Sequence, residues 1–364
     1  MAVQLTREDV LGARVRAQQL DRDAGTPADT TVLDLGVQDT GPDAGRWALA
    51  LRGLADVPPD ELALVWTIRG APHLYRRADL PGVAAATAPF SDADAAKRVF
   101  DAAKPLKAAG IPVPAALDRI AAEMRAIVTT PTVKGEMSRR LSARVDGPYL
   151  RYCRPCDATH LYEMPFRLAA LRAGLELQPD TSPPVLQPVP GFSPAPTVPE
   201  HLDVVRGYLR LHGPATPQQA AEYLDAPVRE VRQRWPEDAV EVSVAGATRW
   251  LLAADVDAAT AGPTRTTRLL GPFDPYLQTR DRALLVPDPA RATDLWRTLG
   301  RPGGVLVDGE IAGTWRPRRT GRRLGVQVEL WDDVPAAART AIGAQAERLA
   351  ACRGAELAAV DLGG

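Results

Sequence analysis

The sequence predicts a mixed α+β protein, built from tandem winged-helix (helix-turn-helix) units followed by a β-rich C-terminal region. Residues 1–178 contain mainly helical patterns, residues 200–254 combine three short helices with two strands, and residues 262–364 alternate as strands before a final helix. A chain of 364 residues is longer than a single hydrophobic core usually supports. We therefore predict three domains with these boundaries.

The central domain has the clearest helix signals. One face of its first predicted helix is apolar and consists of Leu202, Val205, Tyr208 and Leu209. The helix stops at Gly213-Pro214, and a second helix begins with a capping box. In this box Thr216 is the N-cap, Pro217 is the first helical residue and Gln219 is the reciprocal partner.

The third predicted helix of this domain, residues 228–235, is a candidate DNA-recognition helix. Its apolar side chains face inward, whereas Arg229, Arg232 and Arg234 lie on other faces. Two strands around a turn at residues 245–247 complete the order of a winged helix, in which the third helix can enter the major groove. The three arginines are predicted DNA contacts; the alternative is the solvated side of a packing helix.

A second winged-helix unit is predicted within the helical N-terminal region. Its recognition helix would be residues 133–145, and residues 149–152 would form a wing strand. The basic residues of this helix are Lys134, Arg139, Arg140 and Arg144. The helices predicted in this region cover residues 6–20, 43–52, 92–109, 114–128 and 133–145.

Proline and strand patterns organise the rest of the chain. Eight prolines between residues 178 and 199 favour an extended connector at a domain boundary. The C-terminal elements are predicted as strands over residues 305–307, 311–316 and 324–330 and a helix over residues 335–352.

The charge distribution points to local basic patches. A formal net charge of −1 gives the whole molecule no attraction to nucleic acid. However, five arginines without an acid occur within eight residues at the tip of a predicted hairpin: Arg316, Arg318, Arg319, Arg322 and Arg323. Because a basic hairpin can reach a DNA groove or backbone, we predict phosphate contacts by Arg316, Arg318 and Arg319, with a solvated turn as the alternative.

Compartment and metal content are predicted from the cysteines and the hydropathy pattern. Three cysteines, an odd number, favour a reducing compartment, and no segment has the length and apolarity of a membrane span. We predict a cytoplasmic monomer without a membrane anchor or cofactor. Cys153, Cys156 and His160 have zinc-knuckle spacing, but a structural zinc normally needs four ligands, so we predict no metal.

Three segments resemble the AlkZ/YcaQ-like family of winged-helix DNA glycosylases: residues 66–74 (WTIRGAPHL), 270–277 (LGPFDPYL) and 307–316 (VDGEIAGTWR). The resemblance implies a double-stranded DNA partner and excision of bulky or crosslinked N-alkylpurines. At the first segment it implies that Arg69 and His73 contact DNA near the lesion. An arginine binds phosphate and a neutral histidine donates to it; loop residues that cap carbonyls are the alternative.

The family's catalytic signature is Gln-apolar-Gln or Gln-apolar-Asp, and the matching stretch here is residues 36–40 (GVQDT). In one register Gly36 replaces the first polar residue, and in the other Thr40 replaces the second. An N-alkylated purine is cationic and leaves without protonation, so a carboxylate and an amide suffice. We predict Asp39 as the negative charge or general base and Gln38 as the orienting amide; the alternative is that Asp39 only begins a turn.

These residues leave more than one function open. A DNA glycosylase acting in repair is the leading interpretation. The alternative is a non-catalytic DNA-binding or regulatory protein that has lost the glycosylase motif, and the altered GVQDT stretch distinguishes the two. A third interpretation, a protein that sequesters a DNA-reactive small molecule, requires an apolar pocket between domains.

Overall fold

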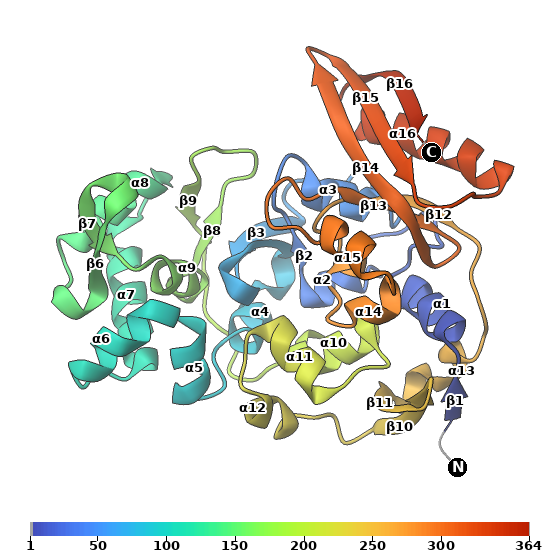
Figure 1. Cartoon of the computed structure of the whole chain (residues 1–364). Coiled ribbons are helices and arrows are strands. Elements are labelled where there is room, and N and C mark those ends of the chain that lie inside the picture. Colours follow the sequence, from blue (N-terminus) through green and yellow to red (C-terminus); the bar gives the residue numbers. More distant parts are fainter. Residues whose placement is uncertain (1–2, 364) are drawn as a thin grey trace. The chain divides into compact units, whose positions relative to one another are not determined.

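The computed structural model describes residues 3–363 and confirms the mixed α+β class (Figure 1). Internal contacts divide the chain into two compact units. Unit 1 consists of the described residues of Met1–Val57, Val205–Tyr223 and Trp235–Gly364, and unit 2 of Pro58–Val204 and Leu224–Arg234. This division differs from the predicted domains, because the N-terminal segment packs with the C-terminal region. Within residues 3–363, no helix has both the length and the apolarity needed to cross a membrane.

Unit 1 is centred on a five-stranded sheet with the order β12-β13-β14-β15-β16. The first four strands are antiparallel neighbours and β16 runs parallel to β15. The strands are β12 (Thr267–Leu270), β13 (Gly303–Val307), β14 (Glu310–Thr320), β15 (Arg323–Leu330) and β16 (Glu356–Gly363). Three predicted strands and the final helix α16 (Ala336–Cys352) are thereby confirmed, whereas β16 was not predicted. Figure 1 shows α16 lying along this sheet.

The N-terminal segment completes the core of this sheet. Leu11 and Val15 on α1 (Arg7–Ala17) and Trp47 on α3 (Ala44–Ala50) belong to the same buried cluster as the strands. The Trp47 indole N–H donates to the Leu269 carbonyl at 2.7 Å. Between these helices lie α2 (Val32–Leu35) and β2 (Val37–Gln38), and the remaining short elements of the C-terminal region are α13 (Val256–Ala259), η8 (Pro275–Gln278), α14 (Arg282–Leu285) and α15 (Pro289–Leu295).

The central region has the predicted order of helices and strands. Its elements are α10 (Val204–His212), α11 (Pro217–Leu224), α12 (Val228–Arg232), β10 (Ala239–Val244) and β11 (Ala247–Leu252). The capping box is confirmed, since the Thr216 hydroxyl accepts from the Gln219 N–H and the Gln219 side chain accepts from the Thr216 N–H. β1 (Val3–Leu5) adds to the hairpin in parallel with β10. Because α12 falls in unit 2, the winged-helix arrangement stays a prediction.

Unit 2 contains a sheet that the helical patterns did not predict. The strands of this sheet that belong to unit 2 follow the order β4-β3-β8-β9-β5, and they are β3 (Leu62–Trp66), β4 (Pro72–Arg76), β5 (Thr132–Val133), β8 (Leu175–Leu177) and β9 (Val185–Pro188). These strands are short, and four of the five residues of β3 are buried. A short apolar run of this kind has no alternating pattern, so periodicity does not identify it.

Helices pack beside this sheet. They are α4 (Leu80–Ala86), α5 (Asp92–Arg98), α6 (Ala103–Ala108), α7 (Val113–Ile127), α8 (Lys134–Ser142) and α9 (Glu163–Arg172). The single helix predicted over residues 92–109 is wrong, because Phe100 has a positive φ of 47° that interrupts it. The predicted helix over residues 133–145 is confirmed as α8, and the strand predicted over residues 149–152 is β6 (Leu150–Cys153), paired with β7 (Ala158–Leu161); their assignment to a winged helix stays a prediction.

Candidate functional site

The GVQDT stretch forms a short polar segment between α2 and α3. Gln38 ends β2, and its amide donates to the Thr40 hydroxyl at 2.9 Å. Asp39 accepts the Gly45 backbone N–H at 2.8 Å, so its carboxylate is held at the first turn of α3. Both predicted catalytic side chains are half-buried. The arrangement places an amide, a hydroxyl and an oriented carboxylate on consecutive residues of unit 1.

The backbone of Gly36 explains one departure from the family signature. Gly36 ends α2 with a φ of 89°, and its N–H donates to the Val32 carbonyl at 3.0 Å. A side chain at this φ would strain the backbone, so a polar residue cannot replace Gly36 without cost. In the other register Gln38 and Thr40 are in contact, but Asp39 occupies the position that the signature gives to an apolar residue.

Arg69 lies in the tight turn between β3 and β4 of unit 2, and His73 is the second residue of β4. Arg69 has a φ of 57°, a left-handed conformation that costs a non-glycine residue on the order of 1 kcal/mol and is common at functional sites. His73 is only 1% exposed, and its Nδ1 donates to the Ala71 carbonyl at 2.9 Å and lies 3.1 Å from the Thr67 hydroxyl. His73 thus braces the turn from inside, and its placement does not support direct contact with DNA.

The buried His73 gives the protein a pH-dependent stability. Burial, with a smaller contribution from the positive charge of Arg69, lowers the pKa of His73 from 6.5 to about 3. Below pH 6.5 the unfolded chain therefore binds a proton that the folded chain excludes, so the free energy of unfolding falls as the pH drops from 6.5 towards 3. Between pH 7 and pH 5, we expect the wild type to lose about 2 kcal/mol more than His73→Gln in urea unfolding. Equal losses in the two proteins would contradict this assignment.

The helix predicted over residues 228–235 ends at Arg232, so Arg234 follows α12; the three arginines are exposed but not equivalent. Arg229 and Arg232 lie on the solvent side of the helix, as predicted. Arg234 donates to the Phe90 carbonyl, pairs with Glu230 at 3.2 Å and stacks over the Phe90 ring at 4.5 Å. This last side chain anchors the helix within unit 2, so Arg229 and Arg232 are the better candidates for a DNA contact.

The basic hairpin is formed by β14 and β15. Its two-residue turn follows Thr320, which pairs with Arg323, and all side chains from residue 317 to residue 323 are exposed. Arg316 and Arg318 lie on one face, where Arg318 donates to the Gln327 amide oxygen at 2.7 Å, and Arg319 lies on the other. The hairpin therefore presents cations on both faces.

A second basic cluster in unit 1 was missed by the sequence analysis. It consists of Arg280, Arg282 and Arg301. Burial and the charges of Arg280 and Arg301 lower the pKa of Arg282 to about 10, and burial and Arg280 also lower that of Arg301. Arg282 stacks over Trp296 and Arg301 over Phe273, at 5.0 and 4.8 Å. Among the described residues, none of the three forms an ion pair, so the cluster is a candidate anion site.

The sequence around this cluster explains its excess charge. Asp281 lies between Arg280 and Arg282, but its carboxylate is 7% exposed and binds Arg14 at 3.1 Å and Arg249 at 3.0 Å. The one acid of the Arg280-Asp281-Arg282 triplet is thus committed to the interior. The sequence shows the alternating charges of this triplet. Only the fold shows that the Asp281 carboxylate is buried away from its two neighbouring arginines.

The segment of residues 270–277 has a structural role. Asp274 and Arg52 are fully buried and form two hydrogen bonds of 2.9 Å, and Asp274 also accepts the Tyr276 N–H. The Tyr276 hydroxyl donates to the Gly309 carbonyl at 2.9 Å, which connects this segment to the segment of residues 307–316. Two of the three family-like segments therefore carry core contacts of unit 1.

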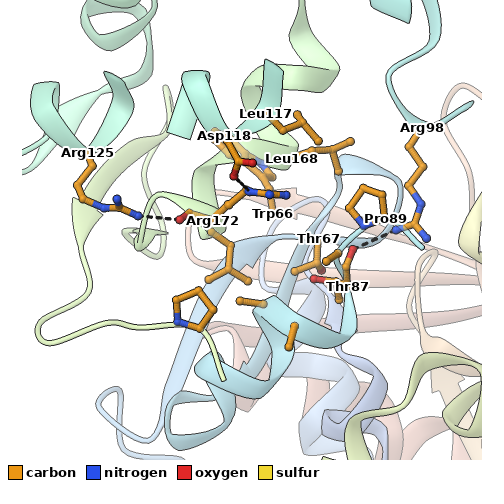
Figure 2. A pocket seen from close by; sticks show the side chains of 15 residues that line it. Trp66, Thr67, Thr87, Pro89, Arg98, Leu117, Asp118, Arg125, Leu168 and Arg172 are labelled. Carbon is orange, nitrogen blue, oxygen red and sulfur yellow. Dashed lines mark hydrogen bonds and ion pairs between the residues drawn. The ribbon is translucent and has the colours of Figure 1, made fainter. Parts of the chain in front are cut away.

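Unit 2 contains a cavity of about 420 Å³ beside the family-like segment of residues 66–74 (Figure 2). Trp66 and Thr67 line it together with residues of α4, α5, α7 and α9. Its charged groups bind one another or the backbone: Arg172 pairs with Asp118 at 2.5 Å, Arg125 donates to the Arg172 carbonyl, and Arg98 donates to the Thr87 carbonyl. The cavity volume suits a small ligand, but it contains neither Gln38 nor Asp39.

Comparisons with known proteins agree with this architecture. The solved structure of the Streptomyces sahachiroi DNA glycosylase AlkZ matches with a TM-score of 0.74 and 20% sequence identity, covering 99% of this chain and 100% of that chain. A likeness at this identity establishes the fold. A comparison with curated protein sequences gives no match. A family model described as "DNA glycosylase AlkZ-like" matches residues 32–352. Since this match spans most of the chain, the protein belongs to the AlkZ-like family of DNA glycosylases, and DNA is its substrate class.

Proposed function

We propose that this protein is a monofunctional DNA glycosylase that excises bulky N-alkylated purines from double-stranded DNA. The family match over residues 32–352 carries the proposal, because it spans the GVQDT stretch and the three family-like segments. The fold likeness over 99% of the chain supports the same conclusion. The non-catalytic alternative rests on the altered signature alone.

Excision of an N-alkylated purine requires few catalytic groups from the protein. An N-alkylated purine is cationic, so the glycosidic bond breaks without protonation of the base and leaves positive charge on the sugar. The Asp39 carboxylate stabilises this developing cation or accepts a proton from the attacking water. The amide of Gln38, which donates to Thr40 at 2.9 Å, positions the water. The Gly45 N–H holds the Asp39 carboxylate in one orientation, which limits reorganisation during the reaction.

DNA binding is proposed to use separate basic surfaces of the two units. In unit 1 these are the hairpin of Arg316, Arg318 and Arg319 and the cluster of Arg280, Arg282 and Arg301. In unit 2 they are Arg229 and Arg232 of α12 and Arg69 of the β3–β4 turn. Arginine binds phosphate oxygens with two parallel N–H donors, so these groups can position the duplex without reading its sequence.

The direct test is incubation of the purified protein with duplex DNA that carries one N7-alkylguanine. Cleavage at abasic sites after mild alkali reports base release. A lesion-dependent signal supports excision. Intact duplex binding with no base release from a series of N3- and N7-alkylpurines of increasing size would overturn the proposal in favour of non-catalytic DNA binding.

The basic hairpin gives a separate binding prediction. Affinity for duplex DNA should fall steeply with salt concentration, because each arginine–phosphate contact releases counterions. The double substitution Arg318→Ala and Arg319→Ala should weaken binding to all sequences alike and reduce the slope of log K against log salt by about 1 per lost contact. Fluorescence anisotropy at several salt concentrations measures both.

A matched control comes from α16 in the same unit. The Arg339 side chain is 41% exposed and pairs with Asp333 at 3.3 Å, so Arg339→Ala should leave the affinity and the salt slope unchanged. If the double variant keeps the wild-type slope, the hairpin does not contact phosphate.

A further inference from the structure

The hairpin of β6 and β7 in unit 2 brings together three metal-binding side chains that no part of the proposed reaction uses. The thiols of Cys153 and Cys156 and a ring nitrogen of His160 all lie within 4.8 Å of one another. The sequence offered the same three residues, but their spacing did not show that the histidine folds back onto the cysteines. We propose that Cys153, Cys156 and His160 bind one Zn²⁺ ion at the tip of this hairpin, with the fourth position open to solvent.

The turn has the backbone geometry that such a site needs. Cys153 ends β6, residues Arg154–Cys156 form a single 3-10 turn, and Asp157 has φ 46° and ψ 43° before β7 begins. The left-handed residue returns the chain, so that both cysteines lie on the inside of the turn. The turn brings the Cys153 and Cys156 sulfurs within 4.8 Å of each other.

His160 is prepared as a ligand by its backbone contact. Its Nδ1 donates to the Leu161 carbonyl at 2.8 Å, which fixes the tautomer and leaves the lone pair on Nε2. Metal-binding histidines are commonly oriented by a hydrogen bond of this kind. His160 lies opposite Arg151 in the antiparallel register, three positions beyond the turn, and a nitrogen of its ring lies within 4.8 Å of the Cys153 sulfur.

The donor set selects the metal. Two thiolates and a neutral imidazole are soft ligands that suit Zn²⁺ in preference to Mg²⁺ or Ca²⁺, and two thiolates balance its charge. Among residues 3–363, no fourth histidine, cysteine or carboxylate oxygen joins the group, so water completes the tetrahedron. A site with two cysteines, one histidine and water is a known zinc arrangement.

The hairpin gains rigidity from such a site. β6 and β7 form a two-stranded sheet with no further strand, and isolated hairpins are marginally stable in water. The base of the hairpin is fixed to α8, where the Leu161 N–H donates to the Ser142 hydroxyl at 3.2 Å. At the tip, Tyr152 is 60% exposed, and its hydroxyl donates to the Asp157 carboxylate at 2.6 Å. Metal binding would crosslink the two strands at this tip.

The test uses full-length protein without a polyhistidine tag, reduced, loaded with Zn²⁺ and dialysed. Elemental analysis should find close to one zinc per chain. Substitution of Co²⁺ should give thiolate-to-cobalt charge-transfer bands and the strong visible absorption of a tetrahedral site. Cys153→Ser and Cys156→Ser should lose the metal and these bands, and His160→Gln should bind zinc at least about tenfold more weakly.

Cys352 provides the control, because it is the third cysteine and lies on α16 of unit 1. Cys352→Ser should keep the full zinc content. In the wild type, zinc should protect two of the three thiols from a thiol reagent until a chelator is added, a measurement that needs no variant. Hydrogen exchange at residues 150–161 should slow when zinc is added.

Three results would overturn the proposal. The first is a zinc content no higher than that of the double variant Cys153→Ser/Cys156→Ser. The second is a cobalt spectrum without thiolate bands. The third is a Cys153–Cys156 disulfide that resists treatment with a thiol reductant. The measurements do not depend on base excision, so they stand whether or not the protein is catalytically active.

Discussion

Asp39→Asn is expected to lower the rate of base excision by about 100-fold or more while leaving DNA affinity nearly unchanged. The substitution removes the negative charge that stabilises the sugar cation. It retains an oxygen that can accept the Gly45 N–H, the contact that holds this side chain at α3. Single-turnover cleavage of an N7-alkylguanine duplex measures the chemical step, and anisotropy measures binding.

Companion variants separate charge from structure at this position. Asp39→Ala should lose the same activity and also about 1 kcal/mol of stability, because the N–H at the start of α3 loses its acceptor. Gln38→Ala should reduce the rate less than Asp39→Asn, since an orienting amide contributes geometry and no charge. Full activity in Asp39→Asn would assign the chemistry to another residue.

Asp274→Ala is expected to lower the free energy of unfolding by about 3–5 kcal/mol. Asp274 and Arg52 are fully buried and share two hydrogen bonds of 2.9 Å, so removal of the carboxylate leaves a guanidinium cation in the core. Asp274 also accepts the Tyr276 N–H, which would lose its partner. Urea denaturation followed by tryptophan fluorescence measures the loss.

An exposed ion pair of unit 1 serves as the comparison. Asp294 and Arg297 are 3.3 Å apart with side chains 40% and 42% exposed, so Asp294→Ala should cost at most about 1 kcal/mol. The double variant Arg52→Met/Asp274→Leu should be more stable than Asp274→Ala, because it leaves no unpaired buried charge. Comparable losses from Asp274→Ala and Asp294→Ala would show that burial of the pair does not control the stability.

Local signals in the sequence predicted many of the elements well. The capping box at Thr216 and Gln219, the helix over residues 336–352 and the β14–β15 hairpin each depend on neighbouring residues, and each lies where the pattern indicates. The family resemblance was likewise readable from three short segments. A single sequence can thus predict the structural features that depend on residues close together in the chain.

Features that depend on distant partners were not predictable. Asp281 reads as the counter-ion of its neighbouring arginines, yet it binds Arg14 and Arg249, and this leaves the cluster of Arg280, Arg282 and Arg301 without an acid. The sheet of unit 2 was missed because its strands are short and buried. His73 was expected at the DNA surface but is 1% exposed, because the turn folds its ring inward. In each case the deciding partner comes from tertiary packing.

The division of unit 1 among three separate chain segments has a consequence for synthesis on the ribosome. Leu11, Val15 and Trp47 belong to the same buried cluster as β13, β14 and β15, which are translated some 250 residues later. The N-terminal segment therefore emerges with its apolar side chains exposed and without the partners that cover them. Unit 2, contained almost entirely in Pro58–Val204, can acquire its contacts much sooner. Residues 7–50 are thus made before unit 2 but gain the strands that cover them only after it, so their apolar surface stays exposed on the nascent chain over this interval.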